Sequence, residues 1–366
     1  MKFTLPDYKA PNFSTPELRN APNARFERAP ADFVAPDDYH ATTIFPEYYN
    51  VNGQWILPKR SRMDCVAILR DGEIYVREFR HIKRGDKIAV GRTEDGSEGI
   101  YVHPNCFSTV SEEGQVQETF TFRQGRSRET AFSIDYDFLY ELLRHERENG
   151  HIVWVMGPAC SFDADSRNAF VTLIEKGYVN ALLGGNALAT HDLEGAYRNT
   201  ALGQDIYTQV PSPNGHYNHI DTINRARYHG SIENFIDAEG IDNGIVYTCV
   251  KRNIPLVLAG SIRDDGPLPG VYADAYAGQD AMRAELSKAT TVIAMASTLH
   301  TIAAGNISPM YIVTDKNTVR PVYFYTVDIS EFSANKLADR GSLSAKSIIT
   351  NAQDFVVHLG KVLGDG

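Results

Sequence analysis

The chain has few cysteines, no long apolar run and no GxGxxG dinucleotide fingerprint. Its four cysteines show no CxxC or other metal-binding spacing, so we expect reduced, buried thiols in a cytoplasmic protein. No stretch approaches the roughly 20 apolar residues that cross a bilayer, and the first residues carry no apolar signal-peptide core. Basic residues are outnumbered by acidic ones, 36 to 46, and the net charge of −10 argues against a nucleic-acid or anionic-membrane partner.

The hydrophobic pattern changes near residue 130. Before it, short β-rich runs alternate with turn signals such as Asn52-Gly53 and Asp71-Gly72, which is typical of antiparallel hairpins in a small barrel or sandwich. After it, strands alternate with helices, which indicates a parallel sheet covered on both faces. The predicted strands are 152–156, 178–183, 256–259, 291–296 and 322–327, and the predicted helices include 133–150, 166–176 and 279–288. We therefore expect an extended N-terminal arm (1–36), a β-rich N-terminal domain (37–130) and an α/β domain (131–366).

Polar side chains directly follow several of these strands. Strand 256–259 leads into Ser261-Ile-Arg-Asp-Asp-Gly266, strand 291–296 into Ser297-Thr-Leu-His300, and strand 322–327 into Asp328. Such loops form the ligand crevice of an open parallel sheet, and a carboxylate in the place of Asp328 accepts hydrogen bonds from an adenosine ribose. This pattern predicts NAD rather than NADP. It is also compatible with ordinary structure, because Asp is a common helix cap and Asp-Gly-Pro is common in turns.

Several motifs, taken in order, resemble the LOR/SDH family, which includes the archaeal-type ornithine cyclodeaminases and the C-terminal domain of arginine dihydrolase/ornithine cyclodeaminase proteins. The resemblance is carried by Arg62-Met-Asp64, Gly157-Pro-Ala159, Gly185-Asn-Ala-Leu-Ala-Thr-His-Asp192, Gly215-His-Tyr-Asn-His219, Ser261-Ile-Arg-Asp-Asp-Gly-Pro-Leu-Pro269, Thr298-Leu-His300 and Lys336-Leu-Ala-Asp-Arg-Gly341. It implies an α/β fold with a Rossmann-like parallel-sheet domain that is related to deoxyhypusine synthase and binds NAD. It also implies a small β-rich N-terminal domain and a homo-oligomer, a dimer or tetramer.

The resemblance further implies the cofactor site and the reaction. Together with Ser297, the positions that match the family's NAD site are Asn186, Ala187, Asp264, Thr298, Leu299, His300, Asp328 and Asp339. The implied reaction converts the amino acid L-ornithine to L-proline and ammonia through hydride abstraction by NAD, cyclisation and re-reduction.

That reaction needs a base, a carboxylate for the cationic chain and a cation for the substrate carboxylate. Adjacent Asp264 and Asp265 are candidates for the first two, because neighbouring like charges raise the pKa of one of them. Arg62 or Arg263 is the candidate cation, and His219 or His300 is a further proton carrier.

Other interpretations stay open. Arg62 could instead pair with Asp64, His219 could be a hydrogen-bonded histidine beside the pocket, and His191-Asp192 is expected to begin a helix. His216 and His219 have no third ligand at a suitable spacing, so we expect no metal. The segments 122–129 and 160–167 depart from the family pattern, and their Arg and Asp residues could suit a longer or more acidic amino acid.

The chain as a whole therefore has three possible functions. The first is the cyclodeaminase or a close relative that acts on another amino acid. The second is an opine-type or deoxyhypusine-synthase-like NAD-dependent enzyme that joins or splits an amine and a carbonyl compound. The third is a non-catalytic amino-acid or nucleotide sensor.

Overall fold

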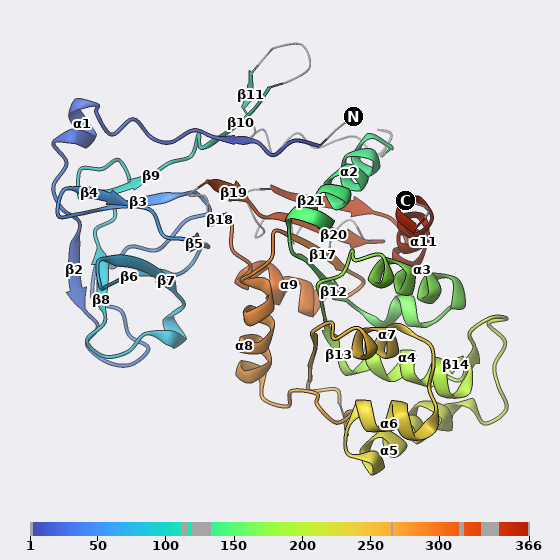
Figure 1. The fold of residues 1–366 in the computed structure, drawn as a ribbon. Coiled ribbons are helices and arrows are strands. Elements are labelled where there is room, and N and C mark those ends of the chain that lie inside the picture. Colours follow the sequence, from blue (N-terminus) through green and yellow to red (C-terminus); the bar gives the residue numbers. More distant parts are fainter. Residues whose placement is uncertain are drawn as a thin grey trace.

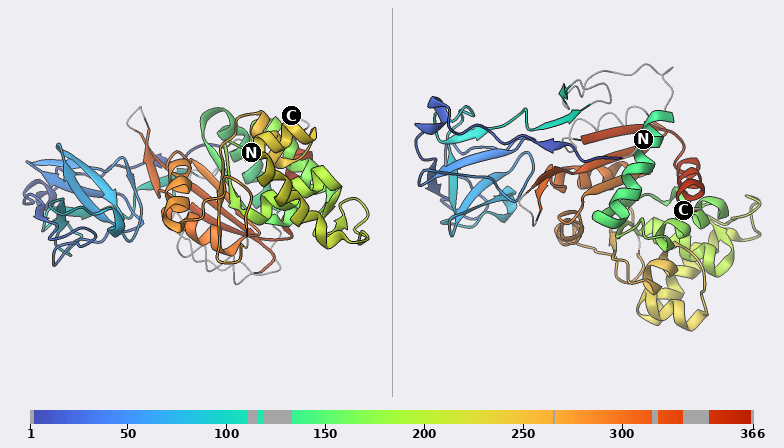
Figure 2. Two further views of the ribbon diagram at one scale, coloured as in Figure 1. Left: turned by 90° about the horizontal axis from the view of Figure 1, so that it is seen from below. Right: turned by 45° about the horizontal axis from the view of Figure 1, so that its top comes forward.

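The computed structural model describes residues 3–110, 116–118, 133–264, 266–314, 318–330 and 344–364. Within these ranges the molecule has two parts that lie side by side (Figure 1). One part consists of antiparallel sheets, and the other is a parallel sheet with helices packed around it. Figure 2 shows the antiparallel part extending from one end of the helical part.

The parallel sheet has six strands in the order β16-β13-β12-β17-β20-β21. These strands are β12 (Ile152–Met156), β13 (Ala181–Gly185), β16 (Leu256–Ala259), β17 (Thr291–Met295), β20 (Tyr323–Asp328) and β21 (Ser344–Ile349). The chain runs from β12 outward to one edge and then from β17 outward to the other, which is the strand order of a Rossmann fold. The direction of progression reverses between β12 and β17, where Met156 pairs with Met295. Ligands of such sheets bind at this switch point, outside the carboxyl ends of the strands.

Helices cover both faces of the sheet, because its strands carry apolar side chains on both sides. The helices of this part are α2 (Ser133–Asn149), α3 (Ala164–Glu175), α4 (Asn186–Arg198), α5 (Asn218–His229), α6 (Ile232–Glu239), α7 (Ile245–Lys251), α8 (Ala275–Leu286), α9 (Thr298–Ile307) and α11 (Ala352–Gly364), with short helices η2 (Pro158–Ser161) and η3 (Gly215–Tyr217) and a hairpin of β14 (Thr200–Ala201) and β15 (Gln204–Asp205). Trp154 and Met156 pack in a core with α2, α3 and α11, and Val153 and Val155 pack on the opposite face with α8 and α9. Helices α4 to α7 share a further core with Leu258 of β16.

In the antiparallel part, a four-stranded sheet (β2-β8-β6-β7) and a three-stranded sheet (β4-β3-β9) share one core, as expected of a sandwich. Their strands are β2 (Arg25–Arg28), β3 (Glu47–Val51), β4 (Gln54–Ile56), β6 (Val66–Arg70), β7 (Glu73–Arg77), β8 (Lys87–Val90) and β9 (Ile100–Val102). Asn52-Gly53 joins β3 to β4 and Asp71-Gly72 joins β6 to β7, with positive φ at all of these residues. These are the two-residue turns that favour hairpins, so the hairpin prediction is confirmed.

The first residues connect the two parts. Phe3 is buried against Phe138 and Tyr323 of the α/β part. Strand β1 (Asp7–Tyr8) pairs with β10 (Phe107–Val110), which also pairs with β11 (Val116–Glu118). Helix α1 (Pro16–Arg19) follows β1 in the chain. Strand β2 pairs with β8, so residues 25–28 of the expected arm belong to the β-rich sheet. A further sheet joins β5 (Arg60–Ser61) to β18 (Tyr311–Val313) and β19 (Val319–Pro321), and the short helix η1 (Phe79–His81) follows β7 in the chain.

The elements predicted for the α/β part are present, with shifted ends. Helix α3 begins at Ala164 because the Asp163 carboxylate accepts a hydrogen bond from the Ser166 amide, and α8 begins at Ala275 because Asp274 caps it in the same way. The expectation that His191-Asp192 begins a helix is wrong. Helix α4 starts as soon as β13 ends, so these two residues lie in its second turn.

Candidate functional site

The carboxyl ends of β13, β16 and β17 converge on His300, in the first turn of α9. Its Nδ1 lies 2.8 Å from the Ser297 hydroxyl, and the Ala259 carbonyl bonds to the ring. A Cβ added to Gly185 would come within 2.8 Å of its Cε1. Burial lowers the pKa of His300, although the Ala259 bond and the nearby Asp264 oppose this. A neutral imidazole that accepts from Ser297 at Nδ1 and donates to Ala259 from Nε2 fits these contacts.

At the switch point, β12 and β17 leave room only for a glycine. The Gly157 amide donates to the Met295 carbonyl at 2.9 Å. A Cβ on Gly157 would lie 1.8 Å from the Ala296 carbonyl oxygen. Ala296 has a φ of 53°, which is uncommon outside glycine. The Gly157-Pro-Ala motif is therefore explained by close approach of the two strand ends.

The carboxyl ends of the parallel strands form one edge of the sheet, called the rim below. Two helices start at this rim without a side-chain cap. Gly185 precedes α4 and Ser297 precedes α9, and neither makes a side-chain hydrogen bond to the first-turn amides. By contrast, α3, α6 and α8 each have an Asp or Ser cap. Thr298 and Leu299, in the first turn of α9, are exposed. Uncapped amides at the positive end of a helix dipole form an anion site, so this geometry fits the phosphates of a dinucleotide.

The loop after β16 is held at the rim by hydrogen bonds. Asp264 Oδ2 accepts from the Ser261 amide at 2.8 Å, and Asn186 Oδ1 accepts from the Leu268 amide at 2.9 Å. Asn186 therefore fixes the loop that carries Asp264, a role that the sequence did not reveal. Arg263 is exposed on this loop. The predicted site residue Asp265 lies outside the described residues.

Asp328 lies at the end of β20, the strand next to β17. It is partly exposed, and its Oδ1 accepts from the Ser330 amide at 2.8 Å. Its other oxygen makes no hydrogen bond with a residue in the described ranges. The neighbouring site prediction, Asp339, lies outside those ranges. Asp328 is thus at the strand end, as expected, with one carboxylate oxygen available to a ligand.

Helix α5 brings two further side chains towards the rim. His219 packs against His191 of α4, with 6.0 Å between the ring centroids. Its Nδ1 is buried and has no hydrogen-bond partner among the described residues. Arg227 lies beside the loop after β16, its Nη1 2.7 Å from where a Cβ on Gly266 would be. No motif marks Arg227, because its position depends on how α5 packs along α4.

Arg62 is not at this rim. Its guanidinium pairs with Glu78 and donates to the Asn306 carbonyl, near the opposite end of α9 and roughly 12 Å along that helix from its first residue. Arg62 therefore does not lie beside Asp264 and His300, and its binding of the substrate carboxylate stays a prediction that these contacts do not support. Its ion-pair partner is Glu78, not Asp64.

The divergent segment 160–167 is structural. Cys160 is fully buried, and burial raises the pKa of its thiol. Asp163 caps α3, and Arg167 donates from Nε to Asp192 at 2.7 Å, where both side chains are almost completely buried. Asp163 and Arg167 are therefore paired within the protein, and the expectation that this segment suits a longer or more acidic substrate stays an untested prediction. The other divergent segment, 122–129, lies outside the described residues.

All four cysteines are free and buried. In the described ranges, no group of three or more His, Cys, Asp and Glu side chains is arranged to hold a metal ion. None of the helices in those ranges is long and apolar enough to cross a membrane.

The strand order and the switch-point geometry define a Rossmann-type α/β protein, and comparison with known proteins agrees. The family model for the C-terminal Rossmann-fold domain of arginine dihydrolase ArgZ-like proteins matches residues 138–359. The ornithine cyclodeaminase of Archaeoglobus fulgidus is 37% identical over 331 residues, which are 90% of this chain and 76% of that protein.

Two solved structures extend the comparison. An LOR/SDH protein from Methanococcus maripaludis has a TM-score of 0.81 and 34% identity, covering 94% of this chain and 99% of that one. AgrE, in a ternary complex with ornithine and NAD+, has a TM-score of 0.57 and 32% identity, covering 94% of this chain and 46% of that one. The chain therefore belongs to the LOR/SDH family of ornithine cyclodeaminases, as the motifs indicated.

Proposed function

We propose that this chain is an NAD-dependent ornithine cyclodeaminase that converts L-ornithine to L-proline and ammonia. Relatives of that name align with most of the chain, and AgrE was crystallised with ornithine and NAD+. The observation that carries the proposal is the meeting of three features at one rim. These are the uncapped first turn of α9, the available oxygen of Asp328 and the loop that carries Asp264.

The rim residues fit a bound NAD. Asp328 would hold the adenosine ribose, and the first-turn amides of α9 would hold the phosphates. Gly157 allows the backbone of the two central strands to come close beneath them. Asn186, Ala187 and Asp264, at the ends of β13 and β16, would contact the nicotinamide end. When bound, NAD supplies an acceptor for the hydride at the substrate's α-carbon and later returns it.

The side chains of the rim then have distinct roles. Asp264 is our candidate base for the proton of the α-ammonium group, because its loop is held over the rim by Asn186. Arg263 or Arg227 would bind the substrate carboxylate through a forked pair of hydrogen bonds. The His300 ring is held by Ser297 at Nδ1 and by the Ala259 carbonyl, so His300 positions the rim. His219, whose Nδ1 has no hydrogen-bond partner among the described residues, is the better reserve proton carrier.

The proposal also covers the enzyme class and the oligomeric state. We propose that the enzyme is an ammonia-lyase that serves proline formation and that it works as a homo-oligomer, a dimer or tetramer. Exposed apolar side chains on and before α5 support an oligomer, among them Tyr207, Val210, Ile220 and Tyr228. A close relative of the cyclodeaminase that acts on another amino acid stays the alternative, and the cytoplasmic location stays a prediction.

The division into parts is proposed on similar grounds. The six-stranded parallel sheet is built from residues after 131, which supports an α/β domain over 131–366. Its relation to deoxyhypusine synthase stays a prediction. The sandwich supports a β-rich N-terminal domain within 37–130. Residues 1–36 would form the arm that links the two, with β2 contributing to the sandwich.

Purified protein tests the proposal. We expect NAD to bind, and L-ornithine to yield equal amounts of ammonia and proline without net formation of NADH. Net NADH turnover with an added keto acid would instead indicate the opine-type enzyme, and ligand binding without turnover would indicate a sensor.

The cofactor assignment has its own test. Asp328→Asn should weaken NAD binding by about 10- to 100-fold, because a charge-assisted hydrogen bond is lost. The matched control is Asp354→Asn, a change in the first turn of α11. Equal NAD affinity in both variants would remove Asp328 from the cofactor site.

A further inference from the structure

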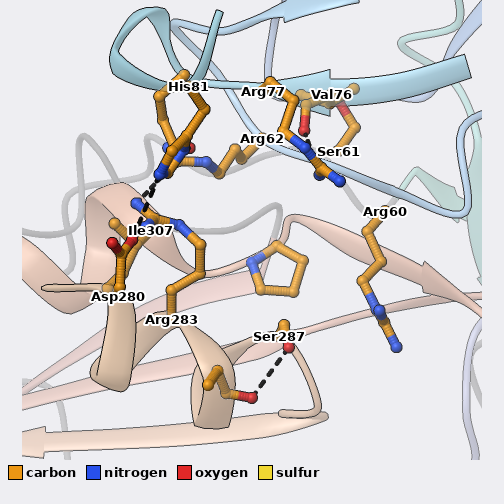
Figure 3. A pocket seen from close by; sticks show the side chains of 13 residues that line it. Arg60, Ser61, Arg62, Val76, Arg77, His81, Asp280, Arg283, Ser287 and Ile307 are labelled. Carbon is orange, nitrogen blue, oxygen red and sulfur yellow. Dashed lines mark hydrogen bonds and ion pairs between the residues drawn. The ribbon is translucent and has the colours of Figure 1, made fainter. Parts of the chain in front are cut away.

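A cavity away from that rim lies between the β-rich part and helices α8 and α9 (Figure 3). Its volume is about 540 Å³, within the usual range for small-molecule sites of about 300–1,000 Å³. Ile307, at the last turn of α9, lines it, whereas the candidate cofactor site is at the first turn of that helix. The two sites are therefore separate.

The walls of this cavity are rich in arginine. The guanidinium groups come from Arg60, Arg62 and Arg77 on the β-rich side and Arg283 on α8. Arginine keeps its charge at any ordinary pH, and its planar fork matches the oxygen pairs of carboxylates and phosphates. The composition of the wall therefore favours an anionic ligand.

The two carboxylates of the cavity are already paired. Glu78 forms ion pairs with Arg62 and Arg283. Asp280 accepts from Arg283 Nη1 at 2.7 Å and forms a second ion pair with Arg80 at 2.5 Å. Neither carboxylate is free to neutralise the remaining arginines.

Arg60 and Arg77 are left with excess positive charge. In the described ranges, Arg60 makes no side-chain hydrogen bond or ion pair. Arg77 donates to the neighbouring Val76 carbonyl at 3.2 Å and lies over the Tyr75 ring, but it pairs with no carboxylate there. Figure 3 shows Arg77 along the β-rich strand and Arg60 to one side of it, with its side chain extending towards the α/β part. Both side chains are exposed to solvent, so their guanidinium groups are open to an anionic ligand at this cavity.

We propose that this cavity binds a small molecule with two anionic groups, either carboxylates or phosphates, through Arg60 and Arg77. The paired arginines, Arg62 and Arg283, line the same cavity from its two sides and are held in place by Glu78. No bond is made or broken, so this is a binding site and not a second catalytic centre.

Calorimetric titration of the whole chain tests the proposal. Saturating NAD is present throughout, so that the anion site at α9 is filled. The probes are succinate, inorganic phosphate and pyrophosphate, at low ionic strength because salt screens such contacts. We expect at least one probe to bind with one molecule per chain. Binding of succinate alone would identify a dicarboxylate ligand, and binding of the phosphates alone would identify a phosphorylated one.

The double variant Arg60→Ala/Arg77→Ala should weaken that binding at least about tenfold, because two charge-assisted contacts are lost. Arg84→Ala, an exposed arginine elsewhere on the β-rich part, should leave it unchanged. If the double variant fails to fold, Arg60→Gln alone should still weaken binding. Absence of saturable binding by every probe, or equal affinity in the wild type and the variants, would overturn the proposal whatever the enzyme's activity.

Discussion

Buried polar groups have protein partners at the amino ends of the parallel strands (the amino edge), whereas several backbone donors have none at the carboxyl ends (the carboxyl edge). At the amino edge, the buried carboxylate of Glu146 accepts from Arg320 at 2.9 Å and from His145 at 2.9 Å, and it also bonds to Thr290. At the carboxyl edge, the first-turn amides of α4 and α9 have no side-chain cap. Polar groups satisfied within the protein contribute to stability, whereas donors left open are available to a ligand.

The largest expected effect separates activity from stability at the carboxyl edge. Asp264→Asn should lower kcat for ammonia release by about 100- to 10,000-fold, because the proposed base is lost. Stability should change little, since an amide oxygen can still accept the Ser261 hydrogen bond. Steady-state kinetics and urea unfolding measure the two quantities. Activity close to that of the wild type would assign the base to another residue.

At the amino edge, a substitution should lower stability. Glu146→Ala leaves the Arg320 side chain buried and unpaired, and we expect the free energy of unfolding to fall by about 3–5 kcal/mol. Urea unfolding measures the loss. The double variant Glu146→Leu/Arg320→Met removes both charges and should recover much of it. A loss as large in the double variant would show that packing, not charge, accounts for the effect.

A smaller effect tests the close approach at the switch point. Gly157→Ala should lower the free energy of unfolding by about 1–3 kcal/mol and weaken NAD binding, because the new Cβ overlaps the Ala296 carbonyl. Gly305→Ala on α9 is the matched control, since its Cβ would lie 3.8 Å from the nearest atom, Phe324 Cζ. That change should be neutral or raise stability by about 0.5–1 kcal/mol. Similar behaviour of the two variants would contradict the packing at the switch point.

The smallest effect concerns pH. Burial lowers the pKa of His300 below the ordinary 6.5, so the unfolded chain binds a proton more readily than the folded one. The stability that depends on neutral His300 is present above pH 6.5 and is lost as the pH falls through the lower folded-state value. Burial has the same effect on His103 and His151. Urea unfolding at a series of pH values below 6.5 measures this effect. The free energy of unfolding should fall less steeply with decreasing pH in His300→Gln than in the wild type. Identical pH dependence in the two proteins would rule out this contribution.

Much of the fold could be predicted because its signals are local. The Asn52-Gly53 and Asp71-Gly72 turns identify hairpins, and the buried strands followed by polar loops identify the α/β part. Element ends were less predictable. The Asp163 and Asp274 caps extend their helices beyond the apolar pattern from which the predictions were made.

The site could be predicted in part, through strand ends and motifs. Asp264, His300 and Asp328 lie at the carboxyl edge as expected. Arg62 does not, because Glu78 and the last turn of α9 hold it in another cavity. Arg167 likewise looked like a substrate-binding charge, but it is buried against Asp192. A charged side chain in a motif does not reveal its partner when that partner is distant in the sequence.

The amino-acid sequence alone determined the α/β class, the hairpins and the residues that follow each strand, because these depend on periodicity and turn chemistry over a few neighbours. Tertiary structure alone decided the strand order, the glycine contact at the switch point and which charges are paired. Those features depend on segments more than a hundred residues apart, such as Glu146 and Arg320, whose burial makes their pairing necessary.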